Sequence, residues 1–297
     1  MKITITGSLG HISLPLTKEL VQKGHVITVI SSKPEKQKDI EALGAIAAIG
    51  SLEDVTFLSS AFTGADAVYT MVPPPNFTDH DLDLAAHCRK IANNYAQAIR
   101  QSGVKRVVHL SSIGAHLAKD SGLILLHHAA EATLNSLADV AVTFMRPVAF
   151  YYNLYAFLPA IKSMGVIASN YGGNDRVAWV SPIDIAAAIA EEIAKPLTGR
   201  KVLYVASDEP SCNEIAGILG ASIGKPDLKW IVIPDQQLQS GMEAAGLAPK
   251  IAAGLVEMNA SIHKGELYAD YNVHKPALGK VKITDFAKEF AAAFNQK

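Results

Sequence analysis

The pattern of hydrophobic and polar positions changes period repeatedly along the first 150 residues. Short apolar runs rich in β-branched residues predict strands; they occupy the run before Gly7 and residues 25–30, 45–49, 67–72, 106–110 and 141–145. Amphipathic or capped segments between them predict helices at residues 12–24, 36–43 and 81–101, after residues 51–54, and at residues 123–137. Six strands alternating with five helical segments predict an α/β fold, a right-handed, doubly wound parallel sheet of the Rossmann type.

A glycine-bearing turn joins the first strand to the first helix. Gly7 and Gly10 lack a Cβ, so the chain can turn sharply and a phosphate can approach the backbone closely. Free N–H groups at the start of the helix then point at that phosphate. The spacing is Gly-x-x-Gly-x-x-Ser, with Ser13 in place of a third glycine, so an ordinary strand-to-helix turn is the alternative. We predict a dinucleotide-binding βαβ unit, with cofactor contacts from Gly7, Ser8, Leu9, Gly10, His11 and Ile12.

The end of the second strand bears on the choice of nucleotide. A protein selective for NAD places Asp or Glu there, where the carboxylate accepts hydrogen bonds from the ribose 2′-hydroxyl. This chain has Ser31, Ser32 and Lys33 instead. Hydroxyls and a cation suit the 2′-phosphate of NADP, so NADP (NADPH) is the predicted cofactor. The alternative is a solvated turn that happens to contain Lys33.

Prolines and hydroxyl residues follow two later strands, at the sheet edge where bound dinucleotides lie. The fourth strand runs into Pro73-Pro74-Pro75, which cannot continue either a helix or a sheet. The fifth strand ends at Ser111-Ser112. A rigid connection without a ligand, or hydroxyls that only cap a turn, are the alternatives. We predict cofactor contacts from Met71, Val72, Pro73, Ser111 and Ser112.

The pattern changes beyond residue 150. Residues 150–155 are rich in aromatic side chains, residues 165–176 are polar, and residues 201–205 predict a strand that returns to the main sheet. Capping boxes are predicted at Ser181 with Asp184 and at Ser211 with Glu214, so Asp184 is interpreted as structural; the last helix should begin at Thr284. We predict an NAD(P)-binding domain at residues 1–150 and a smaller, mainly helical, substrate-side lobe at residues 151–297, from which residues 177–206 return toward the main sheet. The aromatic cluster would form a cleft wall, with substrate contacts from Phe150, Tyr151, Tyr152 and Asn153.

Composition narrows the class of protein. The 297 residues are 49% hydrophobic, enough for a sizeable core. The net charge of −1, without a basic run, argues against nucleic acid and anionic membrane surfaces as partners. No signal peptide or bilayer-spanning run is expected. The two cysteines, Cys88 and Cys212, predict a reducing, cytoplasmic setting and no metal site. We expect a monomer or homodimer that acts on a small molecule.

Motifs spread over nearly the whole chain point to one family. They are Thr6-Gly7-Ser8-Leu9-Gly10-His11-Ile12, Gly64-Ala65-Asp66-Ala67-Val68, Gly103-Val104-Lys105-Arg106-Val107-Val108, His127 with Glu131, and Thr143-Phe144-Met145-Arg146-Pro147. Together they resemble the NmrA-like, atypical short-chain dehydrogenase/reductases, and within them the NADPH-dependent quinone oxidoreductases and triphenylmethane-dye reductases. The resemblance implies that Pro147, Val148 and Phe150 face the nicotinamide. It also implies an adenine side at Ser51 and Leu52, although Ser51 departs from the acidic residue common there.

The same resemblance identifies chemistry that this chain lacks. Mainstream members carry a Tyr-x-x-x-Lys pair on the helix after the fifth strand, and the matching positions here are Leu126 and Ala130. A literal Tyr-x-x-x-Lys at Tyr271 to Lys275 lies in the C-terminal lobe and is interpreted as a chance match. Reducing a ketone leaves a basic alkoxide, for which a positioned acid is worth roughly two to four decades of rate. The hydride adduct of a quinone or cationic dye is delocalised or neutral, so it requires little acid catalysis.

A histidine is the remaining catalytic candidate. The quinone-reductase subgroup often keeps a His at the place matching His127, which implies contact with the nicotinamide or the acceptor and a proton source near neutral pH. The alternative is a helix histidine satisfied by a neighbour.

Three functions follow from these features. The first is an NADPH-dependent oxidoreductase that transfers hydride to a quinone-like or other conjugated acceptor. The second is a non-catalytic, NADP-binding, redox-sensing regulator of the NmrA type, which the missing Tyr/Lys pair suits equally well. The third, a nucleotide-sugar epimerase or dehydratase, requires the absent Tyr.

Overall fold

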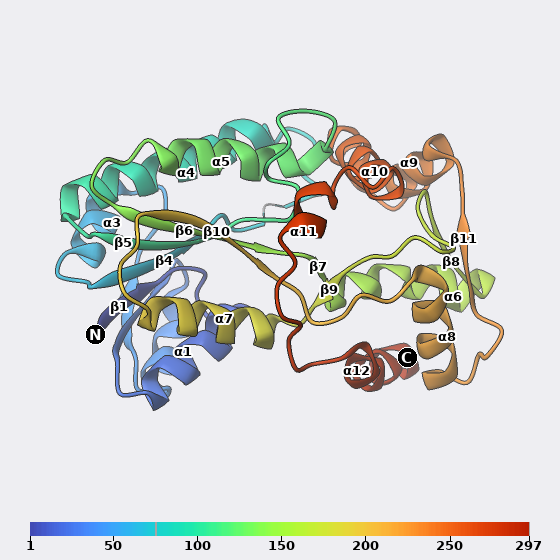
Figure 1. The fold of residues 1–297 in the computed structure, drawn as a ribbon, viewed down its shortest axis with the longest axis horizontal. Helices are drawn as coiled ribbons and strands as arrows, with labels where there is room; N and C mark the ends of the chain where they lie inside the picture. The colour runs from blue at the N-terminus through green and yellow to red at the C-terminus, as the bar shows by residue number, and fades with distance from the viewer. Residues whose placement is uncertain (75, 297) are drawn as a thin grey trace.

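A seven-stranded parallel sheet forms the centre of the computed structural model, which describes residues 1–74 and 76–296 (Figure 1). Its order is β10-β6-β5-β4-β1-β2-β3. The strands are β1 (Lys2–Ile5), β2 (Val26–Ser31), β3 (Ile46–Ile49), β4 (Ala67–Met71), β5 (Arg106–Leu110), β6 (Ala141–Pro147) and β10 (Arg200–Val205). The order reverses between β1 and β4, which is the point where such sheets bind ligands. The predicted doubly wound Rossmann sheet is therefore confirmed, and β10 is the predicted returning strand, paired in parallel with β6.

Helices cover both faces of the sheet. In Figure 1, α4 and α5 lie on one face, and α1 and α7 lie on the other. The helices that connect the strands are α1 (Ser13–Gln22), α2 (Gln37–Ala42), α3 (Val55–Phe62), α4 (Leu84–Ser102), α5 (Leu125–Asn135) and α7 (Pro182–Ala194), with short 3₁₀ turns η1 (Pro34–Lys36) and η2 (Gly122–Ile124). Alternate strand residues pack toward opposite layers: Tyr69 joins the cluster with Leu16, whereas Val68 joins the cluster with Tyr95.

Two element boundaries differ from the sequence prediction because other side chains cap the helices. Asp54 caps α3, since its carboxylate accepts from the Phe57 N–H at 3.0 Å, so the predicted box opened by Ser51 is wrong. Asp83 caps α4 by accepting from the Ala86 N–H at 2.8 Å, which starts this helix later than predicted. The predicted stop at Gly103 is confirmed by its left-handed φ of 72°. Of the three prolines after β4, Pro75 lies outside the described residues.

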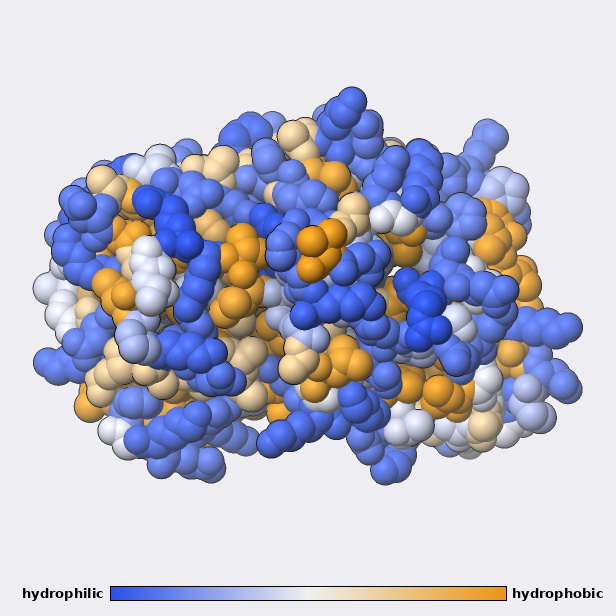
Figure 2. Space-filling model, viewed as in Figure 1, coloured by the Kyte–Doolittle hydropathy of each residue, from blue (hydrophilic) through white to orange (hydrophobic). Residues whose placement is uncertain are grey.

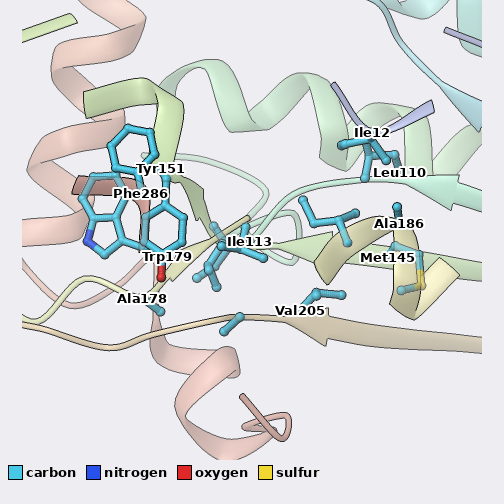
Figure 3. Packing of buried hydrophobic residues seen from close by; sticks show 14 of the residues in the cluster. Ile12, Leu110, Ile113, Met145, Tyr151, Ala178, Trp179, Ala186, Val205 and Phe286 are labelled. Atoms are coloured by element: carbon cyan, nitrogen blue, oxygen red, sulfur yellow. The ribbon is translucent and has the colours of Figure 1, made fainter. Parts of the chain in front are cut away.

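The remaining elements gather beyond the carboxyl ends of the strands. Two small pairs of parallel strands lie there: β7 (Ala149–Phe150) with β9 (Trp179–Val180), and β8 (Val166–Ser169) with β11 (Lys229–Val232). The helical elements of this region are η3 (Tyr151–Phe157), α6 (Leu158–Met164), α8 (Cys212–Ser222), α9 (Asp235–Ala244), α10 (Pro249–His263), α11 (Ala269–Val273) and α12 (Ile283–Asn295). One hydrophobic cluster runs from Ile12 at the start of α1 and Met145 of β6 to Trp179 and Phe286 of this region (Figure 3). The division into two domains stays a prediction.

Asp184 is structural, as predicted, but in a different role. Its carboxylate accepts from the Ser207 hydroxyl at 2.6 Å and from the backbone N–H groups of Lys280 and Val281. Ser181 caps α7, yet its own N–H donates to Ser207 Oγ rather than to Asp184. The predicted capping box at this helix is therefore wrong, whereas the box of Ser211 and Glu214 is confirmed.

The last helix, α12, begins at Ile283, one residue before the predicted Thr284. No helix among the described residues is long and apolar enough to cross a membrane. The face shown in Figure 2 is mostly hydrophilic, with scattered hydrophobic residues.

Candidate active site

The turn between β1 and α1 has the backbone shape that the glycine pattern predicted. Gly7 has φ +89° and Ser8 has φ +54°, and the Ser8 N–H donates to the Ile30 carbonyl at 3.0 Å. The N–H groups of Leu9, His11 and Ile12 have no protein acceptor among the described residues. These amides lie just before the N-terminus of α1, where free donors and the helix dipole favour an anion. The turn therefore fits a pyrophosphate.

Ser13, which stands in place of the third glycine of the dinucleotide-binding pattern, has a structural role in this turn. Its hydroxyl donates to the Thr6 carbonyl at 2.9 Å, so the side chain ties the start of α1 to the end of β1. A Cβ placed on Gly7 would lie 2.7 Å from this Ser13 oxygen. A side chain at residue 7 would therefore displace the Ser13 hydroxyl from its hydrogen bond to Thr6.

At the end of β2, Ser31 is buried, whereas Ser32 and Lys33 are exposed. The Ser31 hydroxyl oxygen accepts from the Ser8 hydroxyl at 2.9 Å and from the Lys33 N–H at 3.2 Å. Ser31 therefore holds the first turn against the second strand. Ser32 and Lys33 are exposed, and the Lys33 ammonium forms no ion pair within residues 1–74 and 76–296. Their side chains are available for a 2′-phosphate.

The other predicted adenine-side residues lie after β3. The Ser51 hydroxyl accepts from the Glu53 N–H at 3.1 Å, and the Leu52 carbonyl accepts from Asn94 Nδ2 at 3.1 Å. The Gly50 N–H donates to the Ser31 carbonyl, which joins this loop to the end of β2. Contact between Ser51 or Leu52 and the cofactor stays a prediction.

Met71 connects β4 to the glycine turn. Its N–H donates to Thr6 Oγ1 at 3.1 Å, and its side chain lies 3.4 Å from the position of a Cβ on Gly7. Val72 and Pro73 follow as partly exposed residues at the same strand end. All three stay predicted cofactor contacts.

An aromatic stack closes over the turn. The rings of His11 and Tyr152 stack with centroids 4.8 Å apart and planes inclined by 28°, and the ring of Phe150 lies 5.0 Å from that of Tyr152, inclined by 37°. Burial raises the pKa of Tyr152 to about 12, so this phenol is neutral near pH 7. The structure thus brings together His11, Phe150 and Tyr152, three predicted site residues from two distant segments.

Tyr151 points the other way from Tyr152, at the start of the 3₁₀ turn η3. Its side chain is buried in the core against Phe286, with ring centroids 5.5 Å apart, and its hydroxyl donates to the Val281 carbonyl at 3.2 Å. The prediction that Tyr151 contacts the substrate is therefore wrong. Asn153 is exposed, and its role stays a prediction.

Pro147 and Val148 form a buried floor at the end of β6. The Ile113 N–H donates to the Pro147 carbonyl at 2.9 Å, and the Val148 N–H donates to the Val205 carbonyl at 3.1 Å. The loop after β5, including the partly exposed Ser112, is thereby held against the ends of β6 and β10.

Ser111 belongs to a buried ionic network that the sequence analysis did not assign. Its hydroxyl donates to Glu131 Oε1 at 2.6 Å. Arg146 donates to both carboxylate oxygens of Glu131, from Nε at 2.9 Å and from Nη2 at 2.7 Å. The side chains of Arg146 and Glu131 are 7% and 8% exposed, so water screens this pair little. Ser111 is thus fixed in the network; contact with a cofactor stays a prediction.

The network continues to the C-terminal part of the chain. Arg146 Nη1 lies 3.2 Å from the Tyr204 hydroxyl and 3.3 Å from Asp270 Oδ2, and the Tyr204 hydroxyl donates to Asp270. It therefore joins the ends of β5, β6 and β10 to α11. The sequence marks Ser111 as a candidate cofactor contact, and Glu131 and Arg146 as parts of motifs without an assigned role; it gives no sign that Tyr204 and Asp270 join them.

His127 lies on α5, one turn before Glu131 in the chain. Burial lowers the pKa of His127 to about 4, against the small opposite effect of Glu131. The imidazole is therefore neutral near pH 7, and a role for His127 as a proton source stays a prediction. Contact of the neutral ring with the nicotinamide or acceptor stays a prediction.

His109 is fully buried on β5. Its Nδ1 lies 2.9 Å from the Thr70 hydroxyl, and burial lowers its pKa to about 3. Within the described part of the chain, no three His, Cys, Asp or Glu side chains are placed to hold a metal ion.

Comparison with known proteins places these features in a family. Residues 7–196 match the family model described as NAD(P)H-binding. The chain is 25% identical to the NAD(P)H azoreductase of Xenophilus azovorans over 98% of this chain and 99% of that one. Its fold is similar to the NADPH-dependent quinone oxidoreductase of Escherichia coli in complex with NADPH, with a TM-score of 0.81, 21% identity, and coverage of 97% and 99%. It is also similar to the NADP(H)-bound triphenylmethane reductase of Citrobacter sp., with a TM-score of 0.77, 20% identity, and coverage of 97% and 99%.

Proposed function

The chain belongs to the NAD(P)H-binding family, and on this premise we propose that it is an NADPH-dependent reductase that transfers hydride to a planar, conjugated acceptor such as a quinone. The observation that carries the proposal is the aromatic stack of His11, Tyr152 and Phe150 over an anion-binding turn. Bound NADPH would supply the hydride. The names of the azoreductase, quinone oxidoreductase and triphenylmethane reductase relatives support a conjugated acceptor.

The turn and the end of β2 would hold the two charged parts of the cofactor. The amides of Leu9, His11 and Ile12 suit the pyrophosphate, and Ser32 with Lys33 suits the 2′-phosphate, because a dianionic group needs donors and positive charge. Lys33 is the residue that would select NADPH over NADH.

The nicotinamide end would lie between the β6 floor and the aromatic side chains. Phe150 and Tyr152 offer flat apolar faces on which a planar acceptor can stack. His127 is neutral near pH 7, and Leu126 and Ala130 occupy the places of the usual acid pair. The protein would therefore orient the acceptor and exclude water, and it would reduce acceptors whose adducts need no strong acid.

The test is to mix the protein, NADPH and a panel of quinones and dyes and to follow the absorbance at 340 nm. The proposal expects oxidation that depends on the acceptor and is faster with NADPH than with NADH. Simple ketones should react slowly. Tight binding of NADPH and NADP without turnover on any acceptor would refute the reductase and would favour the redox-sensing regulator.

A further inference from the structure

A pocket lies against α11, between the segments that precede β9 and follow β10. It has a volume of about 180 Å³ and is lined by Arg176, Ala178, Glu209, Tyr268, Tyr271, Asn272 and Lys275. The ring of Tyr271 packs edge-on against Tyr204 of β10, with centroids 5.5 Å apart. None of its lining residues is among those proposed to hold the cofactor or the acceptor, so this pocket is distinct from the proposed cofactor site. It includes Tyr271 and Lys275, the Tyr-x-x-x-Lys match that the proposed reductase does not use.

The single carboxylate of the pocket, that of Glu209, already accepts two hydrogen bonds from other residues of the pocket. Glu209 accepts from the Tyr271 hydroxyl through Oε1 at 2.5 Å and from Lys275 Nζ through Oε2 at 2.8 Å. Although burial opposes it, the hydrogen bonds from Lys275 and Tyr271 hold the pKa of Glu209 below its ordinary value, so the group is charged near pH 7. Tyr271 and Lys275 are thus joined through a carboxylate, which is not the arrangement of a proton-donating Tyr/Lys pair.

The pocket nevertheless carries a surplus of positive charge and of hydrogen-bond donors. Arg176 and Lys275 give two positive charges against the one negative charge of Glu209. Arg176 makes one hydrogen bond, from Nη2 to the Glu209 carbonyl at 2.6 Å, so its other N–H groups have no acceptor within the described residues. The Asn272 side chain likewise has no hydrogen-bond partner in that part of the chain.

The walls and size of the pocket suit a flat organic body. Tyr268 and Tyr271 contribute aromatic rings, and the Tyr268 hydroxyl is already bound to the Ala178 carbonyl. A volume of about 180 Å³ is many times the roughly 10–15 Å³ that a single water molecule requires, which leaves room for a one-ring compound. A guanidinium with spare parallel donors prefers a carboxylate, which it can bind with two hydrogen bonds.

We infer that this pocket binds a small aromatic carboxylate, with the carboxylate on Arg176 and Lys275 and the ring against Tyr268 and Tyr271. The inference goes beyond the proposed reductase activity and does not depend on it. Both cations are exposed, so the site is open to solvent, and replacing either side chain leaves no buried charge.

The test is calorimetric titration of the full chain with benzoate, in the absence and presence of saturating NADP. We expect saturable binding at one site, unchanged by NADP. Arg176→Gln and Lys275→Gln should each weaken it about tenfold or more, or about 1.4 kcal/mol, since each removes a charge-assisted hydrogen bond. Lys18→Gln, which changes an exposed lysine on α1, is the matched control and should bind benzoate as the wild type does.

Benzamide has the same shape without the charge and should bind at least about tenfold more weakly than benzoate. Absence of saturable benzoate binding, equal affinity for benzamide, or unchanged affinity in both variants would overturn the inference. Displacement of benzoate by NADP would also overturn it, because benzoate would then occupy the nucleotide crevice. If the protein binds no nucleotide, the titration without NADP still decides the question.

Discussion

Removing Glu131 should destabilise the protein far more than removing a surface carboxylate. Glu131→Ala leaves the Arg146 guanidinium, 7% exposed, without its two short hydrogen bonds, and it leaves the Ser111 hydroxyl without its acceptor. Breaking a buried pair from one side costs about 3–5 kcal/mol, because an uncompensated charge stays buried. Asp270 lies 3.3 Å from Arg146 Nη1 and remains as a partial partner, so we expect the lower end of this range, about 3 kcal/mol.

The assay is urea unfolding followed by circular dichroism, with Glu191→Ala as the matched control. Glu191 forms an exposed helix pair with Lys195, and such pairs contribute only about 0.3–0.5 kcal/mol. The double variant Glu131→Met with Arg146→Met should recover part of the loss, because it leaves no unpaired charge. This account of the network would be refuted if Glu131→Ala lowered the free energy of unfolding by less than about 1 kcal/mol. It would also be refuted if the double variant lost more of this free energy than the two single variants together.

Three further outcomes are expected. Desolvation lowers the pKa of His127 to about 4, whereas a histidine in the unfolded chain titrates near 6.5, so the free energy of unfolding falls as the pH drops through this window. Between pH 7 and pH 5 the wild type should lose about 2 kcal/mol more of this free energy than His127→Gln in urea unfolding, and equal losses would contradict the lowered pKa. In equilibrium titrations, Lys33→Glu should weaken the binding of NADPH at least about tenfold and that of NADH about twofold or less, whereas the control Lys38→Glu, at a nearby exposed lysine, should change neither. Equal losses of affinity for both nucleotides would rule out the 2′-phosphate contact. Gly7→Ala and Gly24→Ala each place an alanine at a positive φ, which lowers the free energy of unfolding by roughly 1–2 kcal/mol. Of these two positions, only at Gly7 would the added Cβ lie within 3 Å of a neighbouring atom. Gly7→Ala should therefore be the less stable variant in urea unfolding and the only one of the two to lose NADPH binding.

The parts of this fold that the sequence predicted are those determined by local pattern. The apolar run at residues 106–110 is the strand β5 (Arg106–Leu110), and the glycine turn has the positive φ values that Gly7 allows. Helix starts were less predictable, because Ser51 and Asp54 both suit a cap and only the fold shows which carboxylate or hydroxyl meets a free N–H.

The parts that could not be predicted depend on contacts between distant segments. Nothing local indicates that His11 stacks on Tyr152, or that Arg146 and Glu131 form one network with Asp270. Tyr151 and Tyr152 look alike in the sequence, but the turn of the chain after β7 sends one side chain into the core and the other over the dinucleotide turn.

The most direct test of the account is a structure of the protein with NADPH bound. The account predicts the pyrophosphate on the amides of Leu9, His11 and Ile12, the 2′-phosphate beside Lys33, and the nicotinamide next to Phe150. A nucleotide bound elsewhere, or no binding at millimolar NADPH, would contradict it.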